Sequence, residues 1–167
     1  MEFNEMIGEQ FSACNRDKKW FAPLQSALEG LTAKQASWKM GNDGHSVLQI
    51  VNHLIFWNNR YLQKFKGVES GKMQGDNSST FESGNPVEDD LAWQLTVEKI
   101  NAVMNEFETA ILQCDKTKFE KMVSQENKST WLSVLGNVNL HNAYHIGQIV
   151  LLRKIQESWD AGRNGVH

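Results

Sequence analysis

The sequence predicts an all-α fold, a four-helix bundle with a long loop between its second and third helices. Four long stretches repeat apolar residues at the three- and four-residue spacing of a helix. No stretch alternates apolar and polar residues as a half-buried strand does, and the 167 residues include only two prolines. The length fits one domain, residues 1–167, in which residues 158–167 are expected to form a frayed tail.

The first predicted helix covers residues 3–29 and ends at Gly30. Its apolar stripe consists of Phe3, Met6, Ile7, Phe11, Cys14, Phe21, Leu24 and Leu28. Pro23 lies inside this stretch and predicts a kink or a restart, because proline removes a helical hydrogen bond. Thr32 and Gln35 then have the spacing of a capping box, which predicts one short helical turn.

The second predicted helix begins with another capping box, Ser46 with Gln49, and ends at Gly67. Its inward residues are Val47, Ile50, Val51, Leu54, Tyr61 and Phe65. Residues 68–86 are rich in Gly, Ser, Asn and Asp, and they form a loop longer than a tight helix–helix connection needs. Such a loop allows a crossover between helices. We prefer a disordered crossover to the alternative, a lid over a site.

The third predicted helix starts with Asn85 as its N-cap and Pro86 at its first position, and it runs to about Cys114. Its inward residues are Trp93, Val97, Ile100, Met104, Phe107 and Ile111. A polar connector follows, with a helical turn expected around Phe119 and Met122.

The fourth predicted helix, residues 130–156, contains two histidines one turn apart, His141 and His145. Residues four apart share a helix face, and this face is otherwise apolar: Trp131, Val134, Val138, Ile149 and Leu152. Buried imidazoles need partners, which are either a shared metal ion or hydrogen bonds to backbone carbonyls or to each other. Asn142 stands where zinc-protease helices have glutamate, so that signature is absent.

His53 lies among apolar residues of the second predicted helix. Alone it is typical of a core histidine, but with His141 and His145 it is the natural third metal ligand. Three imidazoles suit zinc, nickel, cobalt, copper or iron better than magnesium or calcium, and they leave a coordination position open. Trp57, one turn after His53, is either a pocket wall beside the ion or a packing residue. His45 is interpreted as a structural or surface residue, with a role at the mouth of the site as the alternative.

The bulk properties disfavour several kinds of partner. A net charge of −3 argues against a broad nucleic-acid interface. The first residues lack the pattern of a signal peptide, and no apolar run is long enough to cross a bilayer. We therefore expect a cytoplasmic protein without a membrane partner. Cys14 and Cys114 occupy apolar helical positions and are expected to be buried free thiols.

Two blocks of the chain, taken in order, match one known family. The first comprises residues 44–47 and 51–54, Gly-His-Ser-Val and Val-Asn-His-Leu, after Leu31-Thr32 and Trp38. The second is residues 141–149, His-Asn-Ala-Tyr-His-Ile-Gly-Gln-Ile. Together they resemble the DinB-like superfamily, the DinB/YfiT-like metalloenzymes, over nearly the whole chain.

The resemblance implies a four-helix bundle with an unusual helix order and a homodimer. It also implies a divalent metal, most often nickel or zinc, held by His53, His141 and His145. Gln148 matches a family position as well, and it is expected either to hydrogen-bond near the site or to pack between helices. Gly147 is expected to permit close approach of a neighbouring helix.

The leading functional hypothesis is a metal-dependent enzyme acting on a small molecule. Similar members of the family include enzymes that transfer a low-molecular-weight thiol to an electrophile, so the resemblance implies this reaction as one possibility. The other possible reaction is hydrolysis by a metal-bound water. No carboxylate or further histidine in the motifs can be assigned as a general base, so the catalytic residues are unassigned. The alternative is a non-catalytic metal- or ligand-binding bundle that acts in a stress response.

Overall fold

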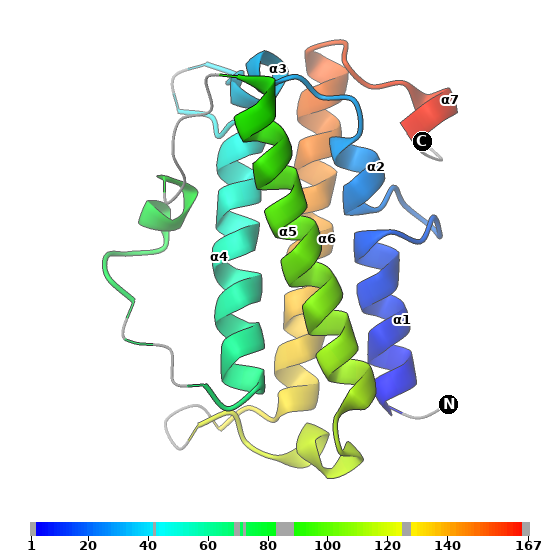
Figure 1. Ribbon diagram of the computed structural model, residues 1–167, viewed down its shortest axis with the longest axis vertical. Helices are drawn as coiled ribbons and strands as arrows, with labels where there is room; N and C mark the ends of the chain where they lie inside the picture. Colours follow the sequence, from blue (N-terminus) through cyan, green and yellow to red (C-terminus); the bar gives the residue numbers. More distant parts are fainter. Residues whose placement is uncertain are drawn as a thin grey trace.

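Four columns of helix pack side by side around one apolar core (Figure 1). The first column is α1 (Phe3–Asn15) followed by α2 (Leu24–Leu28), and the others are α4 (Val47–Phe65), α5 (Asp90–Gln113) and α6 (Trp131–Ile155). The computed structural model describes residues 3–41, 43–68, 71, 73–82, 89–124 and 128–164, without the side chains of residues 163 and 164. Within these ranges there is no strand, and the all-α prediction is confirmed.

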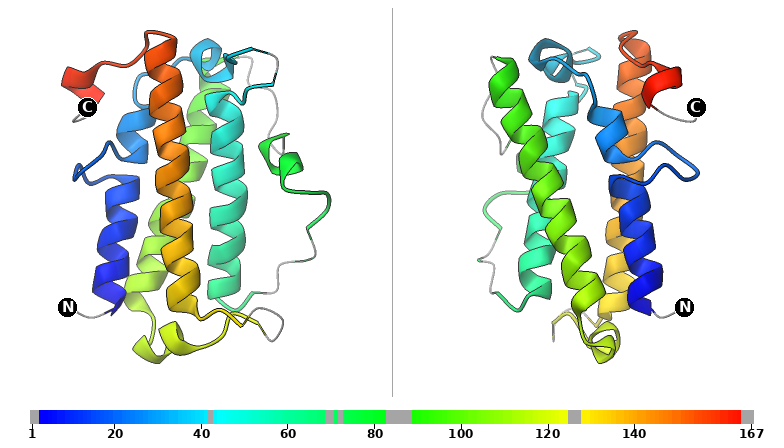
Figure 2. Two further views of the ribbon diagram at one scale, coloured as in Figure 1. Left: turned by 180° about the vertical axis from the view of Figure 1, so that it is seen from behind. Right: turned by 45° about the vertical axis from the view of Figure 1, so that its right-hand side comes forward.

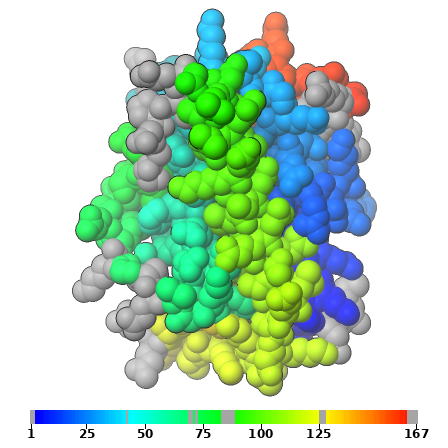
Figure 3. All heavy atoms as spheres, viewed as in Figure 1, coloured from blue at the N-terminus to red at the C-terminus, as the bar shows by residue number. Residues whose placement is uncertain are grey.

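The order of the columns explains the long second loop. The α1–α2 column and α6 run in one direction, and α4 and α5 both run in the opposite direction (Figures 1 and 2). Two consecutive parallel helices cannot be joined by a tight turn, so the chain between α4 and α5 returns along the length of the bundle. The side chains of α4 and α5 nevertheless lie against each other along the bundle (Figure 3). The predicted crossover is therefore confirmed, but the expectation that it is disordered is wrong for residues 78–82, which form a 3₁₀ helix.

The first predicted helix is wrong as a single element, because it breaks at Asn15. The amides of Arg16 and Asp17 both donate to the carbonyl of Ser12 and end α1. Pro23 then serves as the N-cap residue of α2, with an extended backbone. The restart predicted at Pro23 is correct, but the seven residues before it are not helical. Residues 16–19 are all charged and Trp20 is 90% exposed, so no side chain of this segment holds a continuous helix on the core.

Both predicted capping boxes are present. Thr32 caps α3 (Ala33–Ser37). Ser46 Oγ accepts from the amide of Gln49 at 3.2 Å, while Gln49 Oε1 accepts from the amide of Ser46 at 3.1 Å. This cap fixes the first turn of α4, and His53 follows two turns later.

The predicted start of the third helix, Asn85-Pro86, lies outside the described residues. The described α5 begins at Asp90, and its N-cap is Asp89, whose side chain accepts from the amide of Ala92 at 2.8 Å.

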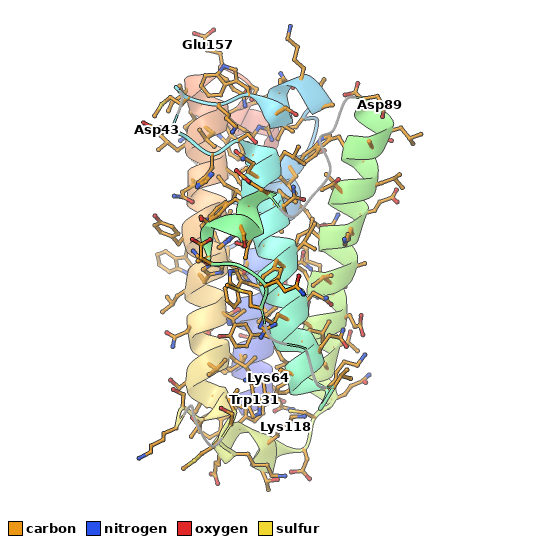
Figure 4. The ribbon with its side chains drawn as sticks, turned by 90° about the vertical axis from the view of Figure 1, so that its left-hand side faces the viewer. Asp43, Lys64, Asp89, Lys118, Trp131 and Glu157 are labelled. Atoms are coloured by element: carbon orange, nitrogen blue, oxygen red, sulfur yellow. The ribbon has the colours of Figure 1, made fainter. Side chains whose placement is uncertain are left out.

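Aromatic rings fill the core at one end of the bundle. Phe107 lies 4.9 Å from Phe11 and 6.1 Å from Phe65 between ring centroids, and Phe65 also contacts Trp131 at 5.0 Å. A short 3₁₀ helix, η2 (Lys116–Glu120), closes this end, where Lys118 and Trp131 are labelled in Figure 4. The turn predicted around Phe119 and Met122 is correct for Phe119, which is fully buried, whereas Met122 is 63% exposed.

The outer side of α6 is unusually apolar. Leu140 and Leu151 are 70% and 57% exposed. Gly147 is also exposed, and a Cβ atom added there would meet nothing within 4 Å. The expectation that Gly147 lets another helix of this chain approach closely is therefore wrong. The homodimer stays a prediction. No helix in the described ranges is long and apolar enough to span a membrane.

The chain after α6 folds back onto the bundle. Arg153, 3% exposed, donates to the carbonyls of Ala27 and Ser158 at 2.8 Å and 2.6 Å. The tail predicted to fray contains a one-turn helix, α7 (Ala161–Asn164). Cys14 is a buried free thiol, as predicted, and Cys114 is free but only half-buried.

Candidate metal centre

Three histidines from two helices converge in the middle of the bundle. His53 comes from α4, and His141 and His145 come from α6, which lies beside α4 (Figure 2). One ring nitrogen of each histidine lies within 4.8 Å of the others. The Nε2 atoms of His53 and His141 are 2.9 Å apart. The structure therefore brings together all three histidines that the sequence proposed as a set.

The cluster fits one divalent ion. Zinc bonds to imidazole nitrogen at about 2.1 Å, so two nitrogens that share an ion lie no more than about 4.2 Å apart. The Nε2 atoms of His53 and His141, 2.9 Å apart, are inside that limit, and all three ligand nitrogens lie within 4.8 Å of one another. Three imidazoles without a carboxylate or thiolate suit a transition metal rather than magnesium or calcium.

The three imidazoles are held in their neutral form, which is the form that binds a metal. Burial is the main cause, and it lowers the pKa of His53 to about 3 and that of His141 to about 4. The neighbouring His145 lowers both pKa values further. Burial also lowers the pKa of His145 itself, against the opposing effect of its hydrogen bond to Gln148. At neutral pH each of the three rings is therefore neutral and carries a single proton.

Hydrogen bonds on the outer side orient two of the rings. The Thr80 hydroxyl donates to the carbonyl of Asn77 at 2.6 Å, so its oxygen accepts from His53 Nδ1–H at 2.6 Å. Gln148 donates its amide nitrogen to the Tyr144 hydroxyl at 3.1 Å and accepts from His145 Nδ1–H at 2.7 Å. In both histidines the proton is on Nδ1. The Nε2 lone pair of His53 then accepts from Nε2–H of His141 at 2.9 Å, so an ion bound by both nitrogens would displace that one proton. Such outer partners fix the tautomer and direction of a metal-ligating imidazole.

The loop between α4 and α5 contributes one side of the site. Its short 3₁₀ helix, η1 (Ser78–Glu82), lies in front of α4 and α6 in Figure 4. The Phe81 ring stacks between two histidines, 4.0 Å from His53 and 3.9 Å from His45 between centroids. His45 is exposed, and its ring is separated from the cluster by Phe81. His45 is not among the described lining residues of the pocket, so its position agrees with its interpretation as a structural or surface residue.

A pocket of about 550 Å³ opens onto the cluster. Besides the three histidines it is lined by Trp57, Asn58, Tyr61, Asn77, Phe81, Ser129, Val134, Asn137, Val138 and Tyr144. Trp57 thus forms part of a pocket wall beside the cluster. Its ring packs on Tyr61 at 6.0 Å between centroids, and its indole N–H donates to Asn77 at 3.2 Å.

A pair of buried amides joins α4 to α6 next to the histidines. Asn58, fully buried, donates to the side chain of Asn142 at 2.8 Å, and Asn142 donates back at 3.0 Å. Asn58 also donates to the carbonyl of Leu54. Because buried amides are costly without partners, this reciprocal pair favours one register of the two helices.

Sequence reasoning missed several residues of the site. Thr80 and Phe81 lie in a loop predicted to have few apolar anchors, yet they are 1% and 8% exposed. A lone aromatic residue in a polar loop was the available signal for Phe81. Tyr61 was assigned to the core, but it lines the pocket. Asn137, one turn before His141, shares its helix face and could have been found from that spacing.

Thr80→Val is expected to weaken metal binding without unfolding the protein. Valine keeps the shape of threonine but cannot accept the proton of His53 Nδ1, and losing an outer partner of a metal ligand costs about 10–100-fold in affinity. Competition with a chromophoric chelator measures this loss. Ser79→Ala, an exposed change on the same segment, is the matched control. Equal affinities for Thr80→Val and wild type would contradict an orienting role for Thr80.

Comparison with known families agrees with this geometry. A family model described as the DinB superfamily matches residues 20–149, a range that contains His53, His141 and His145. No curated protein and no solved structure matches the chain. The matched range covers most of the sequence, including α4, α5 and the greater part of α6. The chain therefore belongs to the DinB superfamily.

Proposed function

We propose that this protein is a metal-dependent enzyme that acts on a small molecule. One observation supports this above all: three neutral imidazoles converge at a pocket of about 550 Å³ that opens to solvent. Three protein ligands leave a coordination position for a substrate or water, as in catalytic rather than structural sites. We propose nickel or zinc as the ion.

The chain's own residues have separable roles in this proposal. His53, His141 and His145 would hold the ion, while Thr80 and Gln148 orient two of them. A divalent ion held there would lower the pKa of a coordinating thiol or water. The walls of the pocket would place a second reactant beside that group and exclude bulk water from it.

Transfer of a small thiol to an electrophile fits the pocket better than hydrolysis. Hydrolysis needs a group that takes a proton from the attacking water. Among the described lining residues there is no carboxylate that could take this proton. A thiol bound as thiolate needs no general base at the moment of attack. Its sulfur forms the new bond to carbon while the electrophile releases its leaving group.

Non-catalytic binding of a metal or ligand is the second candidate. The observation that favours it is the same shortage of acid–base groups around the pocket. A stress-response role would then depend on what fills the pocket. The free thiols of Cys14 and Cys114 suit the reducing cytoplasmic setting proposed for either function.

A reaction panel distinguishes the two functions. Zinc- or nickel-loaded protein is mixed with small thiols and a chromogenic aryl chloride, and release of chloride and formation of the thioether are followed. We expect turnover that His141→Ala abolishes. Equal turnover by wild type and His141→Ala would remove the histidine site from the reaction. Metal binding without turnover on any pair would favour the non-catalytic function.

A further inference from the structure

The walls of the pocket are uncharged. Beyond the three histidines, the described lining residues are aromatic, aliphatic, amide or hydroxyl side chains, and none is Asp, Glu, Lys or Arg. A ligand that carries a carboxylate or ammonium away from the metal-binding atom would lose its hydration without gaining a partner of opposite charge.

An aromatic surface begins directly beside the cluster. The Trp57 ring lies edge-on to His53 at 6.4 Å between centroids, and Tyr61 continues the surface one turn later at an angle of 29° to Trp57. The hydrogen bond from the Trp57 indole to Asn77 fixes the larger ring. Val134 and Val138, on α6, complete an apolar lining. Aromatic rings pack favourably on such a surface.

The polar groups of the lining are mostly committed to the protein. The Asn58 amide bonds Leu54 and Asn142, and the Asn77 side chain accepts from Trp57. Asn137, exposed and one turn before His141, has no such bond. It can both donate to and accept from a ligand, but it supplies no net charge.

We propose that the substrate of this pocket is a small molecule whose body is an uncharged aromatic ring and whose charge is confined to the metal-binding atom. This inference rests on the proposed function only where it takes the metal-binding group to be a thiol. The preference of the pocket for an uncharged aromatic ring does not depend on that function. The ring packs on Trp57 and Tyr61, and Asn137 binds a neutral polar substituent. Thiols with charged bodies, such as glutathione, bind less well.

The first test needs no metal. Binding of benzyl alcohol, benzoate and benzylamine to metal-free protein is measured by titration of amide NMR shifts. We expect benzyl alcohol to bind at least about tenfold more tightly than either charged compound, with shifts at residues 57, 61 and 137. Trp57→Leu should weaken the binding of benzyl alcohol, while Trp20→Leu, at a side chain that is 90% exposed, should leave that binding unchanged. Equal or tighter binding of a charged compound overturns the inference, whatever the metal does.

The second test adds the metal. Cobalt-loaded protein is titrated with phenylmethanethiol, 2-mercaptoethanol and glutathione, and the sulfur-to-cobalt charge-transfer absorption reports binding. We expect phenylmethanethiol to bind about tenfold more tightly than the other two, and Trp57→Leu to affect it alone. A pocket that binds glutathione best overturns the inference. If no thiol produces the absorption band, the proposed transfer of a thiol is wrong. The titration of metal-free protein then decides alone whether the pocket prefers an uncharged aromatic ligand.

Discussion

Replacement of His141 with alanine is expected to lower the affinity for zinc or nickel by more than about a hundredfold. This loss is larger than the loss caused by removing a residue that only hydrogen-bonds to a metal ligand. His141 provides one of three nitrogens in the cluster, and its Nε2 is 2.9 Å from that of His53. Two imidazoles on one side of an open pocket leave an ion mostly bound by water. Wild-type protein, stripped and then reloaded, should take up one equivalent of metal, measured by elemental analysis and chelator competition.

His45→Ala is the matched control for this loss. The ring of His45 stacks on Phe81, which also contacts the cluster. His45 itself is exposed and is not one of the three clustered histidines. We expect it to keep one equivalent with nearly unchanged affinity. If His141→Ala still bound one equivalent as tightly as wild type, the cluster would not be the metal site.

The second large effect is an unusual tolerance of the metal site to acid. Three histidines with the ordinary pKa of about 6.5 would each be about 90% protonated at pH 5.5, and together they would lose affinity by about a thousandfold. Here the pKa of His53 is about 3 and that of His141 about 4, both lowered mainly by burial. We therefore expect a loss of affinity far smaller than a thousandfold between pH 7.5 and pH 5.5, and a steep loss as the pH falls through 4. Zinc affinity measured by calorimetry across this range checks the expectation, and a thousandfold loss by pH 5.5 would contradict it.

The same shifts predict how acid affects the folded state without metal. Below pH 6.5 the imidazoles of the unfolded chain take up protons that the folded His53 and His141 do not. The unfolded state then binds more protons, so the free energy of unfolding falls as the pH drops from about 6.5 towards 4. Thermal unfolding of metal-free protein should show this decline. His141→Ala, which removes one such group, should show a weaker dependence on pH over that interval.

Local patterns in the sequence were sufficient for the helices. Capping boxes at Ser46 and Thr32 are short-range interactions, so the residues that form them could be recognised directly, and both are present. The apolar stripes of α4 and α5 likewise point to the core as expected. The break after Asn15 was missed because apolar residues recur at helical spacing on both sides of it. The residues between them do not pack on the core. The surroundings of Gly147 were missed because spacing alone does not say which side of α6 another helix covers.

The candidate site divides in the same way. The four-residue spacing of His141 and His145 on one helix fixes their shared face, and no other element is needed to see it. Their approach to His53 depends on the register of α4 against α6, which is held by the Asn58–Asn142 pair. That register joins residues more than eighty positions apart in the chain, and helical periodicity contains no information about it.

The sequence by itself therefore determined an all-α fold, its crossover, and a set of three histidines worth considering together. Only the tertiary structure decided that Thr80 and Gln148 orient two of those rings and that Phe81 stacks on His53. It also decided that the described residues lining the pocket include no Asp, Glu, Lys or Arg. The physical reason is the range of the interactions. Helix formation and capping act within a few residues, whereas the site consists of contacts between a loop and two helices that the fold brings side by side.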